Sequence, residues 1–473
     1  MAEPIEVEIV EVCMVAPPPT VNPSPKSLPL TFFDIRWLRF PPYEHLFFYE
    51  IPTPNINKSS NFFFKSILPR LKHSLSLTLL HFLPITGNLT WPPTSPNPGV
   101  EYSESDAVSL TVAKSTADFY RLSGTNDVFC KAADHRSLIP KLSASHERVA
   151  VLAIQVTDFP DHGFSIGITM HHAVLDGKSF HLFMKSWAHI CRSLGSGDHS
   201  GDVHHDQLPP ELTPVYDRTH IKDPADVGTF LSNRWQNMDG PDNRSLLPWK
   251  GSYTVQPDSV RGTFQLPRAK IEKLKQLVND QKHCPIRAST FLVTCAYTWI
   301  CLVKAEEISD NEIPFTFAMD LRSRLEPPIP ATYFGNCVGE NVIVVEREAL
   351  LGKEGLFVAV NAISEAIKGL NEGPLDGAEN WVASSINAVK TFPRQYSVAS
   401  SPRFEVYDTD FGWGKPREVD VVSIDGTGAI CLSENRNGEG GIEIGLVLLK
   451  HHMEACASLF AEGLESLIRS NSG

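Results

Sequence analysis

Residues Gly163 to Gly177 read Gly-Phe-Ser-Ile-Gly-Ile-Thr-Met-His-His-Ala-Val-Leu-Asp-Gly, a stretch that holds both an apolar run and a candidate catalytic histidine. The apolar run Phe164–Met170 predicts a buried strand, which gives way to turn residues and then to a helical pattern. A histidine on a loop at the end of a strand is a typical general base, because imidazole exchanges protons near neutral pH. His172 is therefore the candidate base, and Asp176 is spaced to brace its loop.

The His-x-x-x-Asp spacing is weak on its own. With 17 histidines in 473 residues, roughly one such match is expected by chance, and the chain contains one. The structural alternative for His172 is a core histidine bonded to backbone. Asp176 can pair with His172 itself or, as a buried carboxylate, with an arginine. Arg322, which follows a predicted strand, is one candidate partner.

Composition indicates a globular enzyme of two domains or more. Hydrophobic residues make up 42% of the chain and charged residues 21%, and the net charge of −13 argues against a nucleic-acid-binding surface. The acidic first ten residues are unlike a signal peptide, and no apolar stretch is long enough for a membrane span. The nine cysteines are scattered and odd in number, which favours reduced thiols in a cytoplasmic protein.

A polar segment divides the chain into residues 1–195, a linker at 196–214 and residues 215–473. Hydrophobic periodicity predicts mixed sheets with flanking helices rather than a regular barrel. Helices are expected at 68–83, from 179 onward, at 289–304 and at 453–468. Strands are expected at 149–157, 164–170, 314–319, 341–346, 429–433 and 441–449.

Two other chemistries were weighed. Gly163-Phe-Ser165-Ile-Gly167 matches the G-x-S-x-G elbow of a serine carboxylesterase, but an elbow needs a strand before the serine and a helix after it. Ser165 instead begins a strand, which disfavours this alternative. The linker cluster lacks zinc-site spacing, so we expect no metal site there; it comprises His199, His204, His205 and Asp206. No phosphate-binding glycine motif follows any predicted strand.

A second motif, Asp410-Phe-Gly-Trp-Gly414, lies far downstream. Together with His172–Gly177 it resembles the BAHD family of plant acyl-CoA-dependent acyltransferases. Leu28–Asp34 and Leu75–Leu79 look like the first strand and first helix of that family. Two further segments, Tyr333-Phe-Gly-Asn-Cys337 and Ser401-Pro-Arg-Phe404, resemble its anthocyanin and flavonoid glucoside branch, in which malonyl-CoA is a frequent donor.

The resemblance implies a mixed α/β, chloramphenicol-acetyltransferase-like fold of two domains. Each domain carries a mixed sheet flanked by helices, and a crossover loop joins them. A channel between the domains admits acyl-CoA from one face and the acceptor from the other, and His172 meets both substrates midway. The implied enzyme is a monomer that needs no cofactor, metal or acyl-enzyme.

The resemblance also implies roles for particular residues. Asp176 pairs with Arg322, while the second motif supports the channel wall near CoA through Asp410, Gly412, Trp413 and Gly414. Candidate contacts to CoA or the acyl group are Arg287, Ser289, Thr290, Ser401 and Arg403. A malonyl carboxylate needs a cation, for which Lys178 and Arg403 are the candidates.

The expected activity is transfer of malonyl from malonyl-CoA to a sugar hydroxyl, the 6-hydroxyl of glucose, on a flavonoid, isoflavonoid, anthocyanin or other phenolic glucoside. The alternative donor is a hydroxycinnamoyl-CoA. Relatives that use that donor carry Thr-x-Trp where this chain has Ala399-Ser-Ser401, and loss of the indole suggests a different acyl pocket. A non-catalytic binding protein is the remaining alternative, against which the intact His172 and Asp176 argue.

Overall fold

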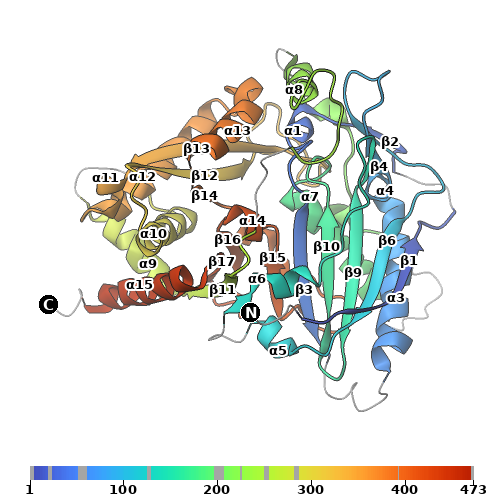
Figure 1. The fold of residues 1–473 in the computed structure, drawn as a ribbon, viewed down its shortest axis with the longest axis horizontal. Helices are drawn as coiled ribbons and strands as arrows, with labels where there is room; N and C mark the ends of the chain where they lie inside the picture. Colours follow the sequence, from blue (N-terminus) through green and yellow to red (C-terminus); the bar gives the residue numbers. More distant parts are fainter. Residues whose placement is uncertain are drawn as a thin grey trace.

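The computed structural model describes residues 5–19, 24–51, 61–124, 129–195, 207–223, 226–249, 255–281, 287–392 and 394–469. A six-stranded mixed sheet is its largest layer (Figure 1), with the order β1-β6-β9-β10-β3-β15. Within it β6 and β9 are parallel, and the other neighbours are antiparallel. The strands are β1 (Glu8–Val15), β3 (Tyr43–Glu50), β6 (Val108–Lys114), β9 (Leu152–Phe159), β10 (Gly163–Met170) and β15 (Glu418–Val421).

The strands predicted at 149–157 and 164–170 are confirmed as β9 and β10, which pair as an antiparallel hairpin. Both strands are buried at every residue, which explains why their sequences are nearly continuous apolar runs. The predicted helices are present as α3 (Leu68–His81) and α7 (Gly177–Gly195). They pack against each other beside the sheet, and the Trp187 indole donates to the Leu71 carbonyl across their contact at 3.3 Å.

The second half of the chain forms two further sheets. One is antiparallel, in the order β16-β17-β11-β7, and the other has the order β13-β12-β14. A bridge between Val398 and Ile430 connects them. The strands are β7 (Cys130–Lys131), β11 (Ser259–Leu266), β12 (Glu312–Asp320), β13 (Val338–Glu346), β14 (Tyr396–Ser397), β16 (Cys431–Glu434) and β17 (Ile442–Leu449). Flanking helices are α9 (Arg268–Asn279), α10 (Thr290–Ala305), α12 (Gly355–Glu372), α13 (Trp381–Thr391) and α15 (Lys450–Arg469).

The two halves of the chain exchange strands, and the expected boundaries at 1–195 and 215–473 stay a prediction. β15 comes from the second half but pairs with β3 in the large sheet, and β7 comes from the first half but pairs with β11. Buried charges join the exchanged parts, because Arg261 of β11 donates to Asp420 of β15 at 3.2 Å and to Asp425 at 2.6 Å. The expected linker falls mostly outside the described residues; its described end contains a 3₁₀ turn, Pro210–Leu212.

The segment Leu28–Asp34, expected as a first strand, is mostly not one. Only β2 (Ser27–Pro29) is extended, in a small sheet with β5 (Gly99–Glu101), β4 (Asn88–Thr90) and β8 (Arg148–Ala150). The chain then turns into α1 (Phe32–Ile35), because the Asp34 carboxylate accepts hydrogen bonds from the Thr31 amide at 2.9 Å and hydroxyl at 2.8 Å. The remaining short helices are α4 (Leu83–Thr86), α5 (Phe119–Leu122), α6 (Ala132–Arg136), α8 (Val227–Gln236), α11 (Arg347–Leu351) and α14 (Ile424–Thr427).

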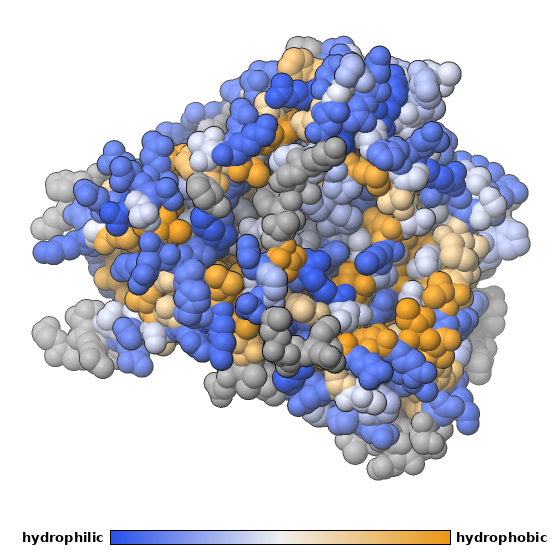
Figure 2. All heavy atoms as spheres, in the orientation of Figure 1, coloured by the Kyte–Doolittle hydropathy of each residue, from blue (hydrophilic) through white to orange (hydrophobic). Residues whose placement is uncertain are grey.

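The face of the molecule drawn in Figure 2 carries many polar groups, with apolar groups between them. One exposed apolar row lies on β1, an edge strand of the large sheet, and includes Ile9, Val12 and Met14. No helix within the described ranges is both long and apolar enough to cross a bilayer.

Candidate active site

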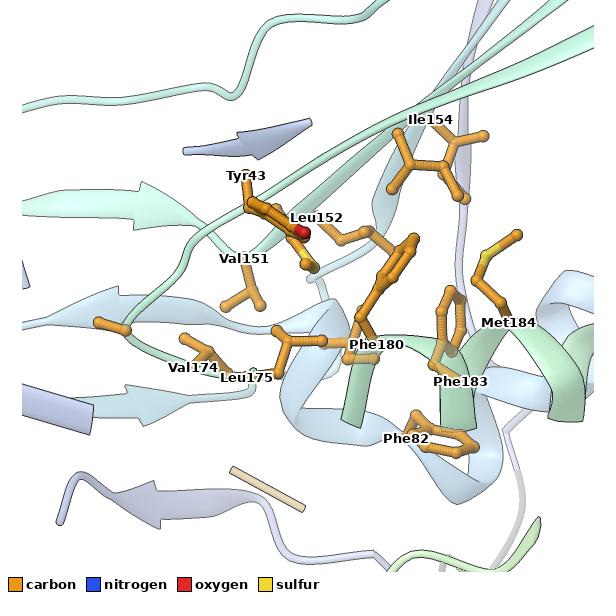
Figure 3. Packing of buried hydrophobic residues seen from close by; sticks show 14 of the residues in the cluster. Tyr43, Phe82, Val151, Leu152, Ile154, Val174, Leu175, Phe180, Phe183 and Met184 are labelled. Atoms are coloured by element: carbon orange, nitrogen blue, oxygen red, sulfur yellow. The ribbon is translucent and has the colours of Figure 1, made fainter. Parts of the chain in front are cut away.

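The His172 loop is anchored by its own apolar residues. It leaves the end of β10, and Val174 and Leu175 are buried. Figure 3 shows both beside Phe180 and Phe183 of α7, which begins directly after the loop. The sequence His-x-x-x-Asp-Gly therefore leads from the strand to the helix through a loop whose middle is part of the core.

The His172 ring is stacked on an indole. Its centroid lies 4.1 Å from that of Trp37, with 9° between the planes, and 5.5 Å from that of Tyr43. His172 Nδ1 is buried without a hydrogen-bond partner, although the residue as a whole is partly exposed, so Nε2 is the accessible nitrogen. Burial lowers the pKa of His172 to about 4, outweighing the raising effects of its own backbone and of Asp176. The imidazole is therefore neutral near pH 7.

The backbone of His172 is held by residues that sequence reasoning missed. Asn336 Nδ2 donates to the His172 carbonyl at 2.9 Å and to Asp34 Oδ1 at 3.0 Å. The backbone amide of Asn336 also donates to Asp34 Oδ1, at 2.8 Å. Asn336 and Asp34 lie in the quoted segments 333–337 and 28–34, but nothing in their spacing revealed that they meet at His172.

Asp176 is a brace rather than a partner of His172. Its Oδ1 accepts from the Ser179 amide at 2.9 Å and Arg322 Nη2 at 3.1 Å, and its Oδ2 accepts from Arg322 Nη1 at 2.8 Å and the Cys337 amide at 3.1 Å. These four donors occupy the lone-pair positions of the carboxylate. The expected pair with Arg322 is therefore present, and it ties the His172 loop to the second half of the chain.

The Asp410–Gly414 loop is stabilised by hydrogen bonds between its own residues. Asp410 Oδ1 accepts from the Gly412 amide at 2.7 Å and the Gly414 amide at 3.0 Å. Gly412 has φ +99°, a conformation that L side chains rarely adopt. The Arg70 guanidinium of α3 lies 3.6 Å from the Trp413 ring centroid, which fixes the loop against the first half of the chain. The expected CoA contact of this loop stays a prediction.

The segment 399–404 lies beside the His172 loop. The Tyr43 hydroxyl donates to the Ala399 carbonyl at 2.8 Å, and the Phe404 ring is so close to Gly177 that a Cβ there would lie 2.8 Å from it. Ser401 caps the following turn by accepting from the Arg403 amide at 3.3 Å, and the Arg403 side chain is exposed. Any side chain at position 177 would therefore force the Phe404 ring to shift.

The other predicted ligand contacts are less closely tied to the loop. Lys178 Nζ donates to Asp320 Oδ2 at 2.8 Å, so its charge is already paired. Ser289 caps α10 by accepting from the Leu292 amide at 3.3 Å, Thr290 begins that helix, and Arg287 is exposed before it. Within the described ranges none of these α10 residues hydrogen-bonds the His172 loop, and their CoA roles stay predictions.

The geometry removes the carboxylesterase alternative. Ser165 lies inside β10, fully buried between β9 and β3, where it pairs with Thr157 and Phe48. Its hydroxyl has no hydrogen-bond partner, and no helix follows it directly. A nucleophile elbow exposes its serine at a sharp turn, so Ser165 is a sheet residue.

Two cavities border the chain segment that holds Trp37. The first, about 400 Å³, is lined by Phe33 together with polar side chains that include His220 and Arg324. The second, about 210 Å³, is lined by Phe40, Glu44 and His171, among others. His172 itself lines neither of these two cavities.

The chain resembles known proteins along nearly its whole length. The Transferase family model matches residues 5–462. Malonyl-CoA:anthocyanidin 5-O-glucoside-6''-O-malonyltransferase of Arabidopsis thaliana is 38% identical, covering 97% of this chain and 98% of that protein. Phenolic glucoside malonyltransferase 1 of the same organism is 36% identical over the same shares of the two chains. The crystal structure of vinorine synthase has a similar fold, with a TM-score of 0.67 at 20% identity, over 95% of this chain and 96% of that one.

Proposed function

This chain belongs to the BAHD acyltransferase family, and from that premise we propose that it transfers malonyl from malonyl-CoA to a sugar hydroxyl of a phenolic glucoside. The acceptor class includes flavonoid, isoflavonoid and anthocyanin glucosides, and the acylated position is the 6-hydroxyl of glucose. The full-length similarity to two glucoside malonyltransferases supports donor and acceptor class. The observation that carries the mechanism is the neutral, partly exposed imidazole of His172.

The proposed step is a direct attack on the thioester. Nε2 of His172 removes the proton of the sugar hydroxyl as its oxygen bonds to the malonyl carbonyl carbon. The tetrahedral intermediate then collapses, the carbon–sulfur bond breaks, and the imidazolium returns its proton to the departing CoA thiolate. His172 ends neutral, so the cycle consumes no other reactant and needs no metal or acyl-enzyme.

For the malonyl carboxylate, Arg403 is the better of the two candidate cations. Lys178 already pairs with Asp320 at 2.8 Å, whereas Arg403 forms no ion pair with the described residues and belongs to the segment beside the His172 loop. We expect Arg403→Met to raise KM for malonyl-CoA but not for acetyl-CoA, which lacks the carboxylate. Lys178→Met is the matched control. A larger effect of Lys178→Met would reverse this assignment.

The remaining proposals concern the setting of the reaction. The partners are the two small-molecule substrates, and the enzyme works as a monomer in the cytoplasm. Seven of the described cysteines, among them Cys191, Cys295 and Cys337, are free thiols, which fits a reducing compartment. Sedimentation and cell fractionation test these two points.

The decisive assay offers the purified protein malonyl-, acetyl- and coumaroyl-CoA in parallel, each with a panel of phenolic glucosides and their aglycones. Product mass reports the acyl group, and the lack of reaction with aglycones reports the sugar as acceptor. We expect malonylated glucosides with native protein and with Ser165→Ala, which removes only a buried strand hydroxyl. Failure with every CoA donor removes the proposal, and faster transfer from coumaroyl-CoA selects the alternative donor.

A further inference from the structure

The orientation of the His172 ring is not set by a carboxylate. In many sites with a histidine base, an acidic side chain accepts a hydrogen bond from the second ring nitrogen and fixes the ring. Here Asp176 has accepted four other hydrogen bonds, and Nδ1 of His172 is buried without a partner. Another group must therefore keep Nε2 pointed at the reacting atoms.

The ring stacked face to face on the imidazole is Trp37, whereas Tyr43 is tilted and farther away, with centroids 5.5 Å apart. The two ring planes are 9° from parallel with centroids 4.1 Å apart, a face-to-face packing that restricts rotation of the imidazole. Asn336 Nδ2 donates to the His172 carbonyl at 2.9 Å, and this hydrogen bond holds the backbone of the loop. The indole therefore presents the closest packed surface to the imidazole.

Trp37 is itself anchored by a buried cation. The Arg36 guanidinium carbon lies 4.5 Å from the Trp37 ring centroid and 5.1 Å from that of Trp381. Arg36 is fully buried and forms an ion pair with Glu340, which also accepts from the Ser385 hydroxyl at 3.0 Å. Cation–π contacts of a desolvated arginine hold an indole firmly. The same positive charge opposes protonation of His172.

We propose that Trp37 is a positioning residue, whose indole, held by Arg36, stacks on the His172 imidazole and keeps Nε2 aimed at the acceptor hydroxyl. This role deepens the proposed function, because it assumes that His172 is the base. It takes the place that a hydrogen-bonded carboxylate has in other histidine-dependent sites. Trp37 and Arg36 follow one another in the sequence, so one short segment supplies both the platform and its anchor.

The test compares Trp37→Leu, which removes the aromatic plane, with Trp37→Phe, which keeps one. We expect kcat to fall about 10²-fold in Trp37→Leu, the order of loss that follows a misplaced catalytic group. KM values for both substrates should change little, and Trp37→Phe should recover most of kcat. Should the leucine variant not fold, Trp37→Met replaces it, since methionine adapts to irregular space.

A second measurement, an NMR titration of the His172 ring, does not depend on enzyme activity. In histidine-labelled protein, the His172 resonance is assigned by its loss in His172→Gln and followed by NMR against pH. We expect its titration midpoint to rise in Trp37→Leu, because the exposed ring is easier to protonate. Trp91→Leu is the matched control: this indole is buried outside the site and donates to the Pro96 carbonyl at 3.3 Å, so its loss should lower stability alone.

The outcomes separate the two proposals. An unchanged midpoint and kcat in Trp37→Leu would overturn the positioning role, as would a rise in acceptor KM with kcat intact, which would make Trp37 a wall of the acceptor site. Absence of malonyl transfer in the native protein would instead defeat the proposed function, while the NMR titration still reports whether Trp37 controls the His172 ring.

Discussion

The two motif loops use the same residue type in opposite ways. In the His172–Gly177 loop, Asp176 reaches outward to Arg322, and with the Cys337 amide this joins the two halves of the molecule. In the Asp410–Gly414 loop, Asp410 turns back to two amides of its own loop. Both aspartates are braces, but one holds a long-range contact and the other a local turn.

The difference lies in burial. Asp176 is 2% exposed and Arg322 is 1% exposed. Each charge therefore relies on the other to replace the hydration that it loses on folding. Asp410 is partly exposed, so water can replace the hydrogen bonds that the Gly412 and Gly414 amides donate to its carboxylate. Replacing each aspartate by asparagine therefore separates the two roles.

His172→Ala should have the largest effect on activity, because it removes the base and leaves both braces. Positioned general bases typically contribute 10²–10⁴-fold, so we expect a loss of about 10³-fold in kcat. The hydrogen bonds that hold both loops remain in this variant, so the melting temperature should change little. Steady-state kinetics with malonyl-CoA and a glucoside measure the first effect, and calorimetry the second. Near-native turnover would remove the mechanism.

Asp176→Asn should have the largest effect on stability. The amide leaves the Arg322 guanidinium buried without its charge partner, a change that costs about 3–5 kcal/mol. Urea unfolding of the native and variant proteins measures the difference. A variant as stable as the native protein, but inactive, would show that Asp176 acts on His172 chemically. It would then be wrong to describe Asp176 as a long-range structural contact and Asp410 as a local one.

The pH profile tests the environment of the first loop. Since catalysis needs neutral imidazole, kcat/KM should fall only as pH drops through the His172 pKa of about 4. At pH 5.5 the rate should remain near its value at pH 7, whereas an ordinary histidine with a pKa near 6.5 would lose about 10-fold.

Stability must be controlled in the same experiment. A histidine whose pKa is lowered by folding stabilises the fold fully above pH 6.5, and this contribution is lost as pH falls toward the folded-state pKa of about 4. Rates are therefore measured soon after a pH change, with circular dichroism as a check that the protein is folded. An acid limb near pH 6.5 in folded protein contradicts the burial of His172.

Asp410→Asn should have the smallest effect. The amide oxygen can still accept from the Gly412 and Gly414 amides, so only the charge is lost, and we expect about 1 kcal/mol or less. The same urea titration as for Asp176→Asn measures it. A loss equal to that of Asp176→Asn would mean that the second loop also carries a long-range contact.

Local features of the fold were predictable from the sequence. Hydrophobic periodicity and turn residues are properties of neighbouring positions. They predict the hairpin of β9 and β10 and the helices α3, α7, α10 and α15. The family resemblance supplied the Asp176–Arg322 pair. It did not supply the contact of Asp34 with Asn336 or the stacking of Trp37 on His172, because residues so far apart in sequence meet only through the tertiary fold.

The exchange of β7 and β15 has a consequence for biosynthesis. The large sheet cannot gain its last strand until Glu418–Val421 has left the ribosome, long after β3 and β10 have emerged. At translation rates of roughly 5–20 residues per second, the β3 edge waits on the order of tens of seconds. During that interval the nascent chain exposes an unpaired strand edge, which is prone to aggregation. Chaperone binding to ribosome-bound chains should therefore persist until this strand is made.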